Sequence, residues 1–174
     1  MSKIDHPLTN IRGVVFDVDG VLSPSLVPMS DDGVPMRMAN LKDGYALQLA
    51  VKCGLKIAII TGANTESIRT RYSALGIHDI FLSSAQKLPI LTKWMKDNDL
   101  HPDEVAYAGD DIPDIPPMQA VGLAVAPADA AAEVKQGARY ITTACGGYGV
   151  ARELLEQILR AKGQWMNETK AFGW

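Results

Sequence analysis

The stretch Val14-Val15-Phe16-Asp17-Val18-Asp19-Gly20 sets the expectation for the whole fold. Its first residues are apolar, and they are β-branched or aromatic, so they predict a buried strand. Two carboxylates and a glycine follow where this strand ends. In open α/β sheets the carboxyl ends of the strands border the crevice in which ligands bind. We therefore expect Asp17 and Asp19 to lie in such a crevice, although a strand end followed by an Asx turn would give the same pattern.

Short apolar runs alternate with amphipathic stretches along the rest of the chain. This alternation predicts βαβ units and a parallel sheet that helices cover on both faces. The sequence has no internal repeat, low-complexity tract or linker, so we expect one Rossmann-like α/β domain over residues 1–174. The predicted strands are 11–17, 55–61, 80–83, 105–109, 123–126 and 140–142, and the predicted helices are 44–51, 65–75, 89–98, 114–120, 130–136 and 149–162.

Composition and charge exclude several classes of protein. The net charge of −3, without a basic cluster, argues against nucleic acid as the main partner. The apolar runs have the length of strands rather than of membrane spans, and residues 1–7 lack the apolar core of a signal peptide. Cys53 and Cys145 make neither a disulfide framework nor a zinc-ligand spacing. These features favour a globular protein of the cytoplasm that does not contact membranes.

Residues 23–40 break the alternation because they carry no helical period. Asp32-Gly33 between apolar residues predicts a hairpin turn, while three prolines weaken both of its strands. We expect a β-hairpin that projects beside the crevice. Its apolar side chains would need cover, either from another subunit or by folding back onto their own domain. These side chains are Val27, Met29, Met36 and Met38.

Two further segments carry residues that suit an anion. Thr61-Gly62 follows a predicted strand and precedes a helix, where a hydroxyl and free backbone N–H groups can bind a phosphate. Lys87 stands at the start of a helix, where its charge opposes the helix dipole unless an anionic partner is present. Taken singly, the first segment could be a helix cap and turn, and the lysine could be an ordinary solvated side chain.

A third segment, Gly109-Asp110-Asp111-Ile112-Pro113-Asp114, is more specific. Another predicted buried strand ends in three carboxylates within five positions. Clustered carboxylates repel one another, so a site that holds several of them normally holds a cation. Oxygen ligands that stay partly open to water and phosphate suit Mg²⁺.

Together these motifs resemble those of the haloacid dehalogenase-like phosphatases. Asp17-x-Asp19, Thr61-Gly62, Lys87 and the acidic segment 109–114 occur in that family's order and at its kind of spacing. Residues 38–44 and 146–153 are similar to segments of its small capless branch, and the resemblance covers nearly the whole chain.

The resemblance implies a Mg²⁺-dependent phosphatase that works through an aspartyl-phosphate. Asp17 would be the nucleophile. Asp19 would be the general acid for the leaving hydroxyl and then the base for the attacking water. The metal would lie between the side chains of Asp17 and Asp110 and the backbone carbonyl of Asp19.

The resemblance also implies how the transferring phosphate is held. The Thr61 hydroxyl, the Gly62 amide and the Lys87 ammonium would bind its oxygens. Asp111 and Asp114 would orient metal-bound waters and Lys87 from behind.

For the substrate, the resemblance implies a phosphorylated 2-keto-3-deoxy sugar acid. The first choice is 3-deoxy-D-manno-octulosonate 8-phosphate, whose product feeds lipopolysaccharide assembly. The alternatives are the nine-carbon nononate 9-phosphate, another sugar phosphate or, more remotely, a non-catalytic binding module. Relatives often carry an arginine after Thr-Gly that can meet the sugar carboxylate, whereas this chain has Ala63. The substrate-binding candidates are therefore Lys42, Asp43, Arg69 and Arg71.

Assembly is the last implication of the resemblance. Capless members are homotetramers in which the hairpins associate and a neighbouring subunit helps to close each active site. The tail 164–174 contains two tryptophans and a phenylalanine, more aromatic side chains than a disordered tail usually has. It could pack on a neighbouring subunit near an active site, or equally well on its own domain.

Overall fold

The computed structural model describes residues 4–167 and 169–173. Among these residues, six strands form one sheet in the order β3-β2-β1-β4-β5-β6. Every neighbouring pair is parallel, as the alternation of the sequence predicts. The strands are β1 (Gly13–Phe16), β2 (Lys56–Ile60), β3 (Asp79–Phe81), β4 (Val105–Ala108), β5 (Leu123–Ala126) and β6 (Tyr140–Ile141).

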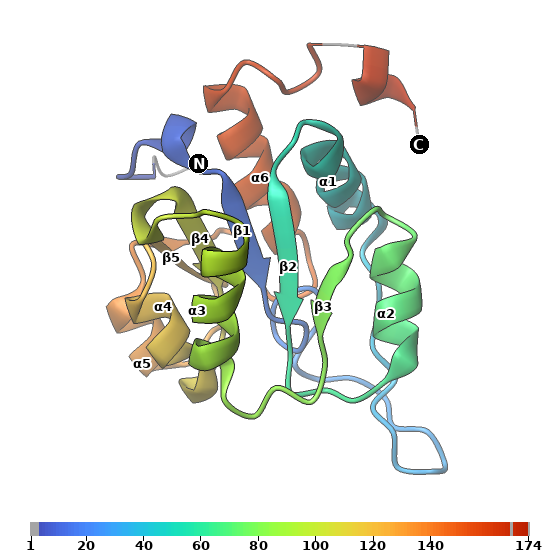
Figure 1. Cartoon of the computed structure of the whole chain (residues 1–174). Coiled ribbons are helices and arrows are strands. Elements are labelled where there is room, and N and C mark those ends of the chain that lie inside the picture. Colours follow the sequence, from blue (N-terminus) through green and yellow to red (C-terminus); the bar gives the residue numbers. More distant parts are fainter. Residues whose placement is uncertain (1–3, 168, 174) are drawn as a thin grey trace.

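Helices cover both faces of this sheet, with α1, α2 and α6 on one face and α3, α4 and α5 on the other (Figure 1). None of the helices in the described ranges is long and apolar enough to cross a membrane. The α-helices are α1 (Leu41–Lys52), α2 (Glu66–Ser73), α3 (Lys87–Asp97), α4 (Ile115–Gln119), α5 (Ala132–Gly137) and α6 (Val150–Ala161). Short 3₁₀ helices are η1 (Leu8–Asn10), η2 (Pro102–Glu104), η3 (Ile112–Asp114) and η4 (Thr169–Phe172).

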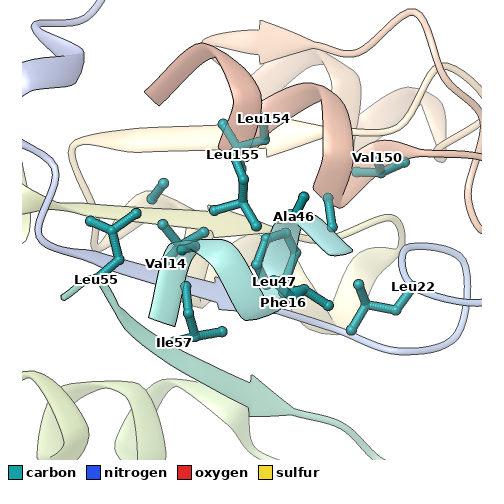
Figure 2. Close-up of a cluster of buried hydrophobic side chains, with 14 of the residues drawn as sticks. Val14, Phe16, Leu22, Ala46, Leu47, Leu55, Ile57, Val150, Leu154 and Leu155 are labelled. Carbon is teal, nitrogen blue, oxygen red and sulfur yellow. The ribbon is translucent and has the colours of Figure 1, made fainter. Parts of the chain in front are cut away.

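Strand β1 lies in the middle of the sheet and is buried on both faces. Val14 and Phe16 point into the cluster formed with α1 and α6 (Figure 2), and Val15 points into the opposite cluster formed with α3. This double burial explains why the strand reads as a continuous apolar run. Burial of each such side chain stabilises the fold by about 1.5–3 kcal/mol, which makes β1 a rigid base for the residues after it.

The order of the strands reverses at β1. The chain passes from β1 to β2 and β3 on one side and then returns to β4 on the other side. The crevice beyond the carboxyl ends of β1 and β4 is therefore the topological switch point, where open α/β sheets bind ligands. Asp17 follows β1 and Asp110 follows β4, so both emerge at this crevice.

The segment 23–40 projects from the same end of the sheet, as the light blue loop at the bottom of Figure 1 shows. It is a hairpin with a single antiparallel bridge, between Met29 and Pro35, closed by a hydrogen bond from Gly33 N to Ser30 O. The prolines withhold the donors that two longer paired strands would need. Of the four apolar side chains that the sequence singled out, Met29, Met36 and Met38 are exposed and do not fold back onto their own domain, whereas Val27 is half-buried. Leu26 beside them is 89% exposed.

The tail packs on its own chain. Trp165 is buried against the Tyr45 ring in an edge-to-face contact, and Tyr45 and Lys52 donate to the backbone carbonyls of Ala171 and Gly173. Helix α6 ends near the amino ends of the strands, whereas the crevice and the hairpin lie at their carboxyl ends. The described tail residues are therefore far from the hairpin (Figure 1). Of the two packing alternatives for the tail, the structure therefore has the one within its own domain. Residues 168 and 174 lie outside the described residues.

Candidate active site

Asp17 is held at the end of β1 by its backbone and its side chain. Its N–H donates to the carbonyl of Ala108 at 3.0 Å and so continues the pairing of β1 with β4. The carboxylate is only 7% exposed: Oδ1 accepts from Val18 N at 2.6 Å, and Oδ2 accepts from Lys87 Nζ at 2.6 Å. The carboxylate is thus fixed at the mouth of the crevice with a cation beside it.

Lys87 is the first residue of α3, and its ammonium lies between two carboxylates. Its Nζ is 2.6 Å from Asp17 Oδ2 and 2.7 Å from Asp114 Oδ1, and the residue is 6% exposed. Burial alone would lower the pKa of Lys87, but the charges of Asp17 and Asp114 outweigh it and the pKa is raised. Lys87 is therefore a charged, buried residue of the site, and the alternative of a solvated surface lysine is excluded.

Asp114 holds several parts of the site together. Its Oδ1 accepts from Lys87 and, at 2.8 Å, from the Tyr107 hydroxyl, while its Oδ2 accepts from the backbone N–H groups of Asp110 and Asp111 at 3.1 and 3.4 Å. Tyr107 is a residue that the sequence did not point to, because it lies inside the apolar run of β4. Both oxygens of Asp114 are engaged, so this carboxylate serves to position Lys87 and the acidic loop.

Carboxylate oxygens of Asp17, Asp110 and Asp114 all lie within 4.8 Å of one another. Burial, with the charges of Asp17 and Asp114 added, raises the pKa of Asp110 to about 7. Burial and the charge of Asp114 raise the pKa of Asp17 to about 6, although Lys87 opposes the shift. The negative charge of this cluster is thus incompletely balanced by the protein. A divalent cation with oxygen ligands such as Mg²⁺ fits here, with Asp17 and Asp110 as the available side chains.

Gly20 shows that the loop after β1 is shaped around Asp110. A Cβ atom at this position would lie 1.8 Å from Asp110 Oδ2, and the backbone has a φ of +77°. Only glycine combines this conformation with so close an approach. The loop that carries Asp19 is therefore held directly against the carboxylate that follows β4.

One pocket of about 360 Å³ brings together the residues expected to bind and attack a phosphate. Thr61, at the end of β2, is buried, and its Oγ1 accepts from Ala63 N at 3.2 Å. Gly62 is exposed beside it, which leaves its backbone open to the pocket. The residues in this pocket that the sequence predicted are Asp17, Asp19, Thr61, Gly62 and Lys87.

Asp19 is paired with Arg37, a residue that the sequence analysis missed. Arg37 Nε and Nη2 donate to the two carboxylate oxygens of Asp19, each at 2.8 Å. Arg37 comes from the returning arm of the hairpin, and it also lines the pocket. The only sequence signal for it is that it is the one charged residue between Asp32 and Lys42.

The remaining predicted residues lie outside this pocket. Asp111 is exposed, and its Oδ1 accepts from Ile112 N at 2.8 Å, so it caps η3. Lys42 is exposed in the first turn of α1. Asp43, expected among the substrate-binding candidates, is buried, and its Oδ1 accepts from Arg152 N at 2.6 Å at the start of α6. Burial raises the pKa of Asp43 to about 6. Asp43 thus joins α1 to α6 instead of facing the crevice.

The two arginines of α2 differ in their surroundings. Arg69 donates to the carbonyl of Ile80 at 3.2 Å and lies 3.6 Å from Glu66. Arg71 lines a second pocket next to the first, and Arg37 borders both. The Nη2 of Arg71 is buried and has no hydrogen-bond partner among the described residues. A buried guanidinium nitrogen without a partner favours an anionic ligand, so the half-buried Arg71 is the stronger of the two candidates.

Asp17, Lys87 and Asp110 thus lie together at the switch point of an all-parallel α/β sheet, where such folds bind ligands. Residues 55–154 match the model of the haloacid dehalogenase-like hydrolases. The chain belongs to this family, as its motifs indicate.

Several individual members of this family are similar to the chain over most of its length. The chain is 37% identical over 161 residues to the 3-deoxy-D-manno-octulosonate 8-phosphate phosphatase KdsC of Escherichia coli strain K12, covering 92% of this chain and 85% of that protein. The crystal structure of the Yersinia pestis 3-deoxy-D-manno-octulosonate 8-phosphate phosphatase superposes with a TM-score of 0.87 at 35% identity, covering 91% of this chain and 85% of that one.

A third relative was crystallised with ligands. The 3-deoxy-D-manno-octulosonate 8-phosphate phosphatase of Moraxella catarrhalis, in complex with a magnesium ion, a phosphate ion and a KDO molecule, superposes with a TM-score of 0.89 at 29% identity. The match covers 96% of each chain.

Proposed function

We propose that this chain is a Mg²⁺-dependent phosphatase that hydrolyses 3-deoxy-D-manno-octulosonate 8-phosphate. The names of the relatives support the substrate and the reaction. The observation that carries the proposal is the buried Asp17 carboxylate, fixed by Lys87 and Val18 N in a pocket that also contains Thr61.

Asp17 is the nucleophile of this mechanism. Its carboxylate attacks phosphorus, the bond from phosphorus to the sugar oxygen breaks, and an aspartyl-phosphate forms. Water then attacks the phosphorus of this intermediate and regenerates the carboxylate. Lys87 keeps the approaching carboxylate and phosphate from repelling each other, and Thr61 and the Gly62 amide donate to the phosphoryl oxygens.

Asp19 moves the protons. In the first step it donates a proton to the departing sugar oxygen, and in the second it takes a proton from the attacking water. It lies two residues beyond Asp17 and lines the same pocket, which suits a group that must reach the far side of the phosphorus.

The side chains of Asp17 and Asp110 and the backbone carbonyl of Asp19 would hold Mg²⁺. When bound, the ion offsets the repulsion between Asp17 and a dianionic phosphate. Asp114 keeps Lys87 and the Asp110–Asp111 backbone in place, and Asp111 shapes the loop around them.

Arg71 binds the carboxylate of the sugar acid in this proposal. It stands in for the arginine that relatives often carry at the position of Ala63. Its buried, unpaired Nη2 and its place in the pocket next to the catalytic one support this role over Arg69 or Lys42.

We also propose that the protein works as a homotetramer in the cytoplasm and supplies lipopolysaccharide assembly. Association through the hairpins would cover the exposed side chains of Leu26, Met29 and Met36. No further cover for them exists within the described part of the chain.

Phosphate release tests the proposal, with the eight-carbon 8-phosphate and the nine-carbon 9-phosphate as substrates and Asp17→Asn as the control. We expect Mg²⁺-dependent turnover that favours the eight-carbon substrate by ~100-fold, a discrimination of ~2.7 kcal/mol. Preference for the nine-carbon substrate would keep the phosphatase and contradict the substrate. Full activity of Asp17→Asn would contradict the mechanism.

A further inference from the structure

The side chain of Asp19 is more exposed than those of Asp17 and Lys87, the other charged residues that line the catalytic pocket with it. Its side chain is 44% exposed and lies on a turn, where an aspartate can adopt several rotamers. Among the residues that the structure describes, only Arg37 donates hydrogen bonds to its oxygens, and it does so with both arms of its fork. Two parallel N–H···O bonds fix the plane of a carboxylate as well as its position.

Arg37 is itself firmly held. Its side chain is 11% exposed, and its Nη1 donates to Thr65 Oγ1 at 3.1 Å and to the carbonyl of Pro35 at 3.3 Å. Thr65 is the N-cap residue of α2, so the guanidinium is bonded to the start of a helix as well as to its own hairpin. Four of the five N–H donors of the guanidinium are thereby engaged within the protein.

The base of the hairpin is also pinned to the domain. Met38 N donates to the Oγ of the fully buried Ser23 at 3.0 Å, and the Asn40 side chain donates to the carbonyl of Gly147 at 3.1 Å. Arg37 precedes Met38 directly, so its backbone has a defined place although the tip of the hairpin projects.

We infer that Arg37 is a positioning residue that aims Asp19 at the leaving oxygen of the substrate. The inference rests on the proposed function, because it assigns Arg37 to the proton transfers of Asp19. Reaction requires near-attack geometry, and small misplacements of a proton donor lower the rate. Arg37 acts through Asp19 and not on the substrate, since most of its donors are already used. The hairpin is then part of the catalytic machinery as well as a surface for association.

Leaving-group dependence separates this role from a purely structural one. A sugar alkoxide needs a proton as it leaves, whereas the p-nitrophenolate of p-nitrophenyl phosphate does not. Because Asp19 is also the base in hydrolysis of the aspartyl-phosphate, a step that both substrates share, the comparison uses kcat/KM, which reports only the steps up to formation of that intermediate. We expect Arg37→Ala to lower kcat/KM for 3-deoxy-D-manno-octulosonate 8-phosphate about 30-fold and to change kcat/KM for p-nitrophenyl phosphate by less than about threefold. Arg37→Lys, which cannot form the fork, should recover only part of the loss.

Arg12→Ala is the matched control. Arg12 also donates to a carboxylate, that of Glu104, at 3.1 and 3.2 Å, but this pair lies at the amino ends of β1 and β4, away from the crevice. This variant should leave both activities unchanged. A double-mutant cycle completes the test: in an Asp19→Asn background, Arg37→Ala should cause no further loss with the sugar phosphate.

An equal loss of kcat/KM with both substrates, or a further loss in the Asp19→Asn background, would overturn the role of Arg37. If the wild-type enzyme prefers another sugar phosphate, the same comparison is made with that ester, so an error in the substrate does not affect the result. A wild-type enzyme that releases phosphate from no ester would contradict the proposed function itself and the inference with it.

Discussion

Burial has opposite outcomes at two carboxylate sites in this molecule, because the protein supplies hydrogen bonds to the carboxylate at one and not enough at the other. Glu153, in the first turn of α6, accepts from the Tyr140 hydroxyl at 2.5 Å, from Thr143 N and Oγ1, and from Ala144 N at 3.1 Å. Burial would raise the pKa of Glu153, but these hydrogen bonds outweigh it and the pKa is lowered. At the crevice, by contrast, burial raises the pKa of Asp17 to about 6 and that of Asp110 to about 7.

This difference in pKa distinguishes a carboxylate with a structural role from carboxylates that can bind a cation. The protein supplies every hydrogen bond that Glu153 needs, and so it fixes the loop that leads to Gly146 and Gly147. That loop supports the active site from behind: Gly147 N donates to Val21 O at 2.8 Å, and a Cβ atom on Gly146 would lie 2.0 Å from Gly20 O. At the crevice the protein leaves charge unbalanced, which is where a cation and a phosphate would complete it.

The largest effect should follow Asp17→Asn, which removes the nucleophile and keeps the shape. We expect kcat to fall by about 10⁴-fold or more. The melting temperature should change by only a few degrees, because Lys87 keeps its partner Asp114. Steady-state kinetics and thermal melts measure the two quantities. A variant that unfolds, or one that keeps a tenth of the activity, would contradict the claim that Asp17 serves catalysis and Glu153 serves stability.

Glu153→Ala should give the reverse pattern. It leaves several buried donors unpaired, so the free energy of unfolding should fall by about 3 kcal/mol. The variant should still turn over substrate at low temperature, because its side chain does not line the pocket. Urea unfolding measures the loss, and Glu133→Ala, at an exposed position in the first turn of α5, is the control. Equal stability of the two variants would contradict the structural role of Glu153.

Mg²⁺ affinity should depend on pH because protons compete for the same carboxylates. Asp110, with its pKa of about 7, and Asp17, with its pKa of about 6, must both be ionised to bind the metal. As pH falls from 8 to 6, protons fill these sites, and the dissociation constant should rise by about twentyfold. Calorimetric titrations at the two pH values measure it. A constant affinity would contradict the charge imbalance at the crevice.

Asp43→Asn should have the smallest effect and refine the comparison. Asp43 is buried with one unpaired oxygen, and burial raises its pKa in the folded state to about 6, above the ordinary value of 3.8. Its ionised form therefore destabilises the fold above pH 6, and this cost disappears as pH falls from about 6 toward 3.8. The asparagine variant should be about 1 kcal/mol more stable than the wild type at pH 8, with a smaller difference at pH 5. A variant less stable at pH 8 would contradict this sign.

Much of the fold could be predicted because its strands are short, largely apolar and separated by amphipathic helices. The first residues of the helices were predicted less accurately. The sequence predicted a helix from residue 89, but α3 begins at Lys87, since Pro89 is tolerated in a first turn. Helix α1 begins at Leu41, three residues earlier than expected, where the Asn40 side chain accepts from Lys42 N and Asp43 N. That N-cap was a readable signal.

The site could be predicted where chemistry is concentrated in local motifs, as it is at Asp17 and Lys87. Tyr107 could not be found in this way because it lies inside the apolar run of β4, and Arg37 could not because it meets Asp19 only when the hairpin folds back toward the crevice. Asp43 was predicted as a substrate-binding candidate, but its carboxylate meets the backbone of Arg152, which lies far along the chain. No pattern within α1 reveals that the start of α6 lies against it.

Trapping the covalent intermediate tests the central claim most directly. Borohydride reduces an acyl phosphate to an alcohol, so an enzyme quenched during turnover of 3-deoxy-D-manno-octulosonate 8-phosphate should contain homoserine in place of one aspartate. Peptide mass spectrometry should locate that residue at position 17 and nowhere else, and should find none in enzyme quenched without substrate. Homoserine at position 19 or 110, or unmodified Asp17 under steady turnover, would contradict an aspartyl-phosphate at Asp17.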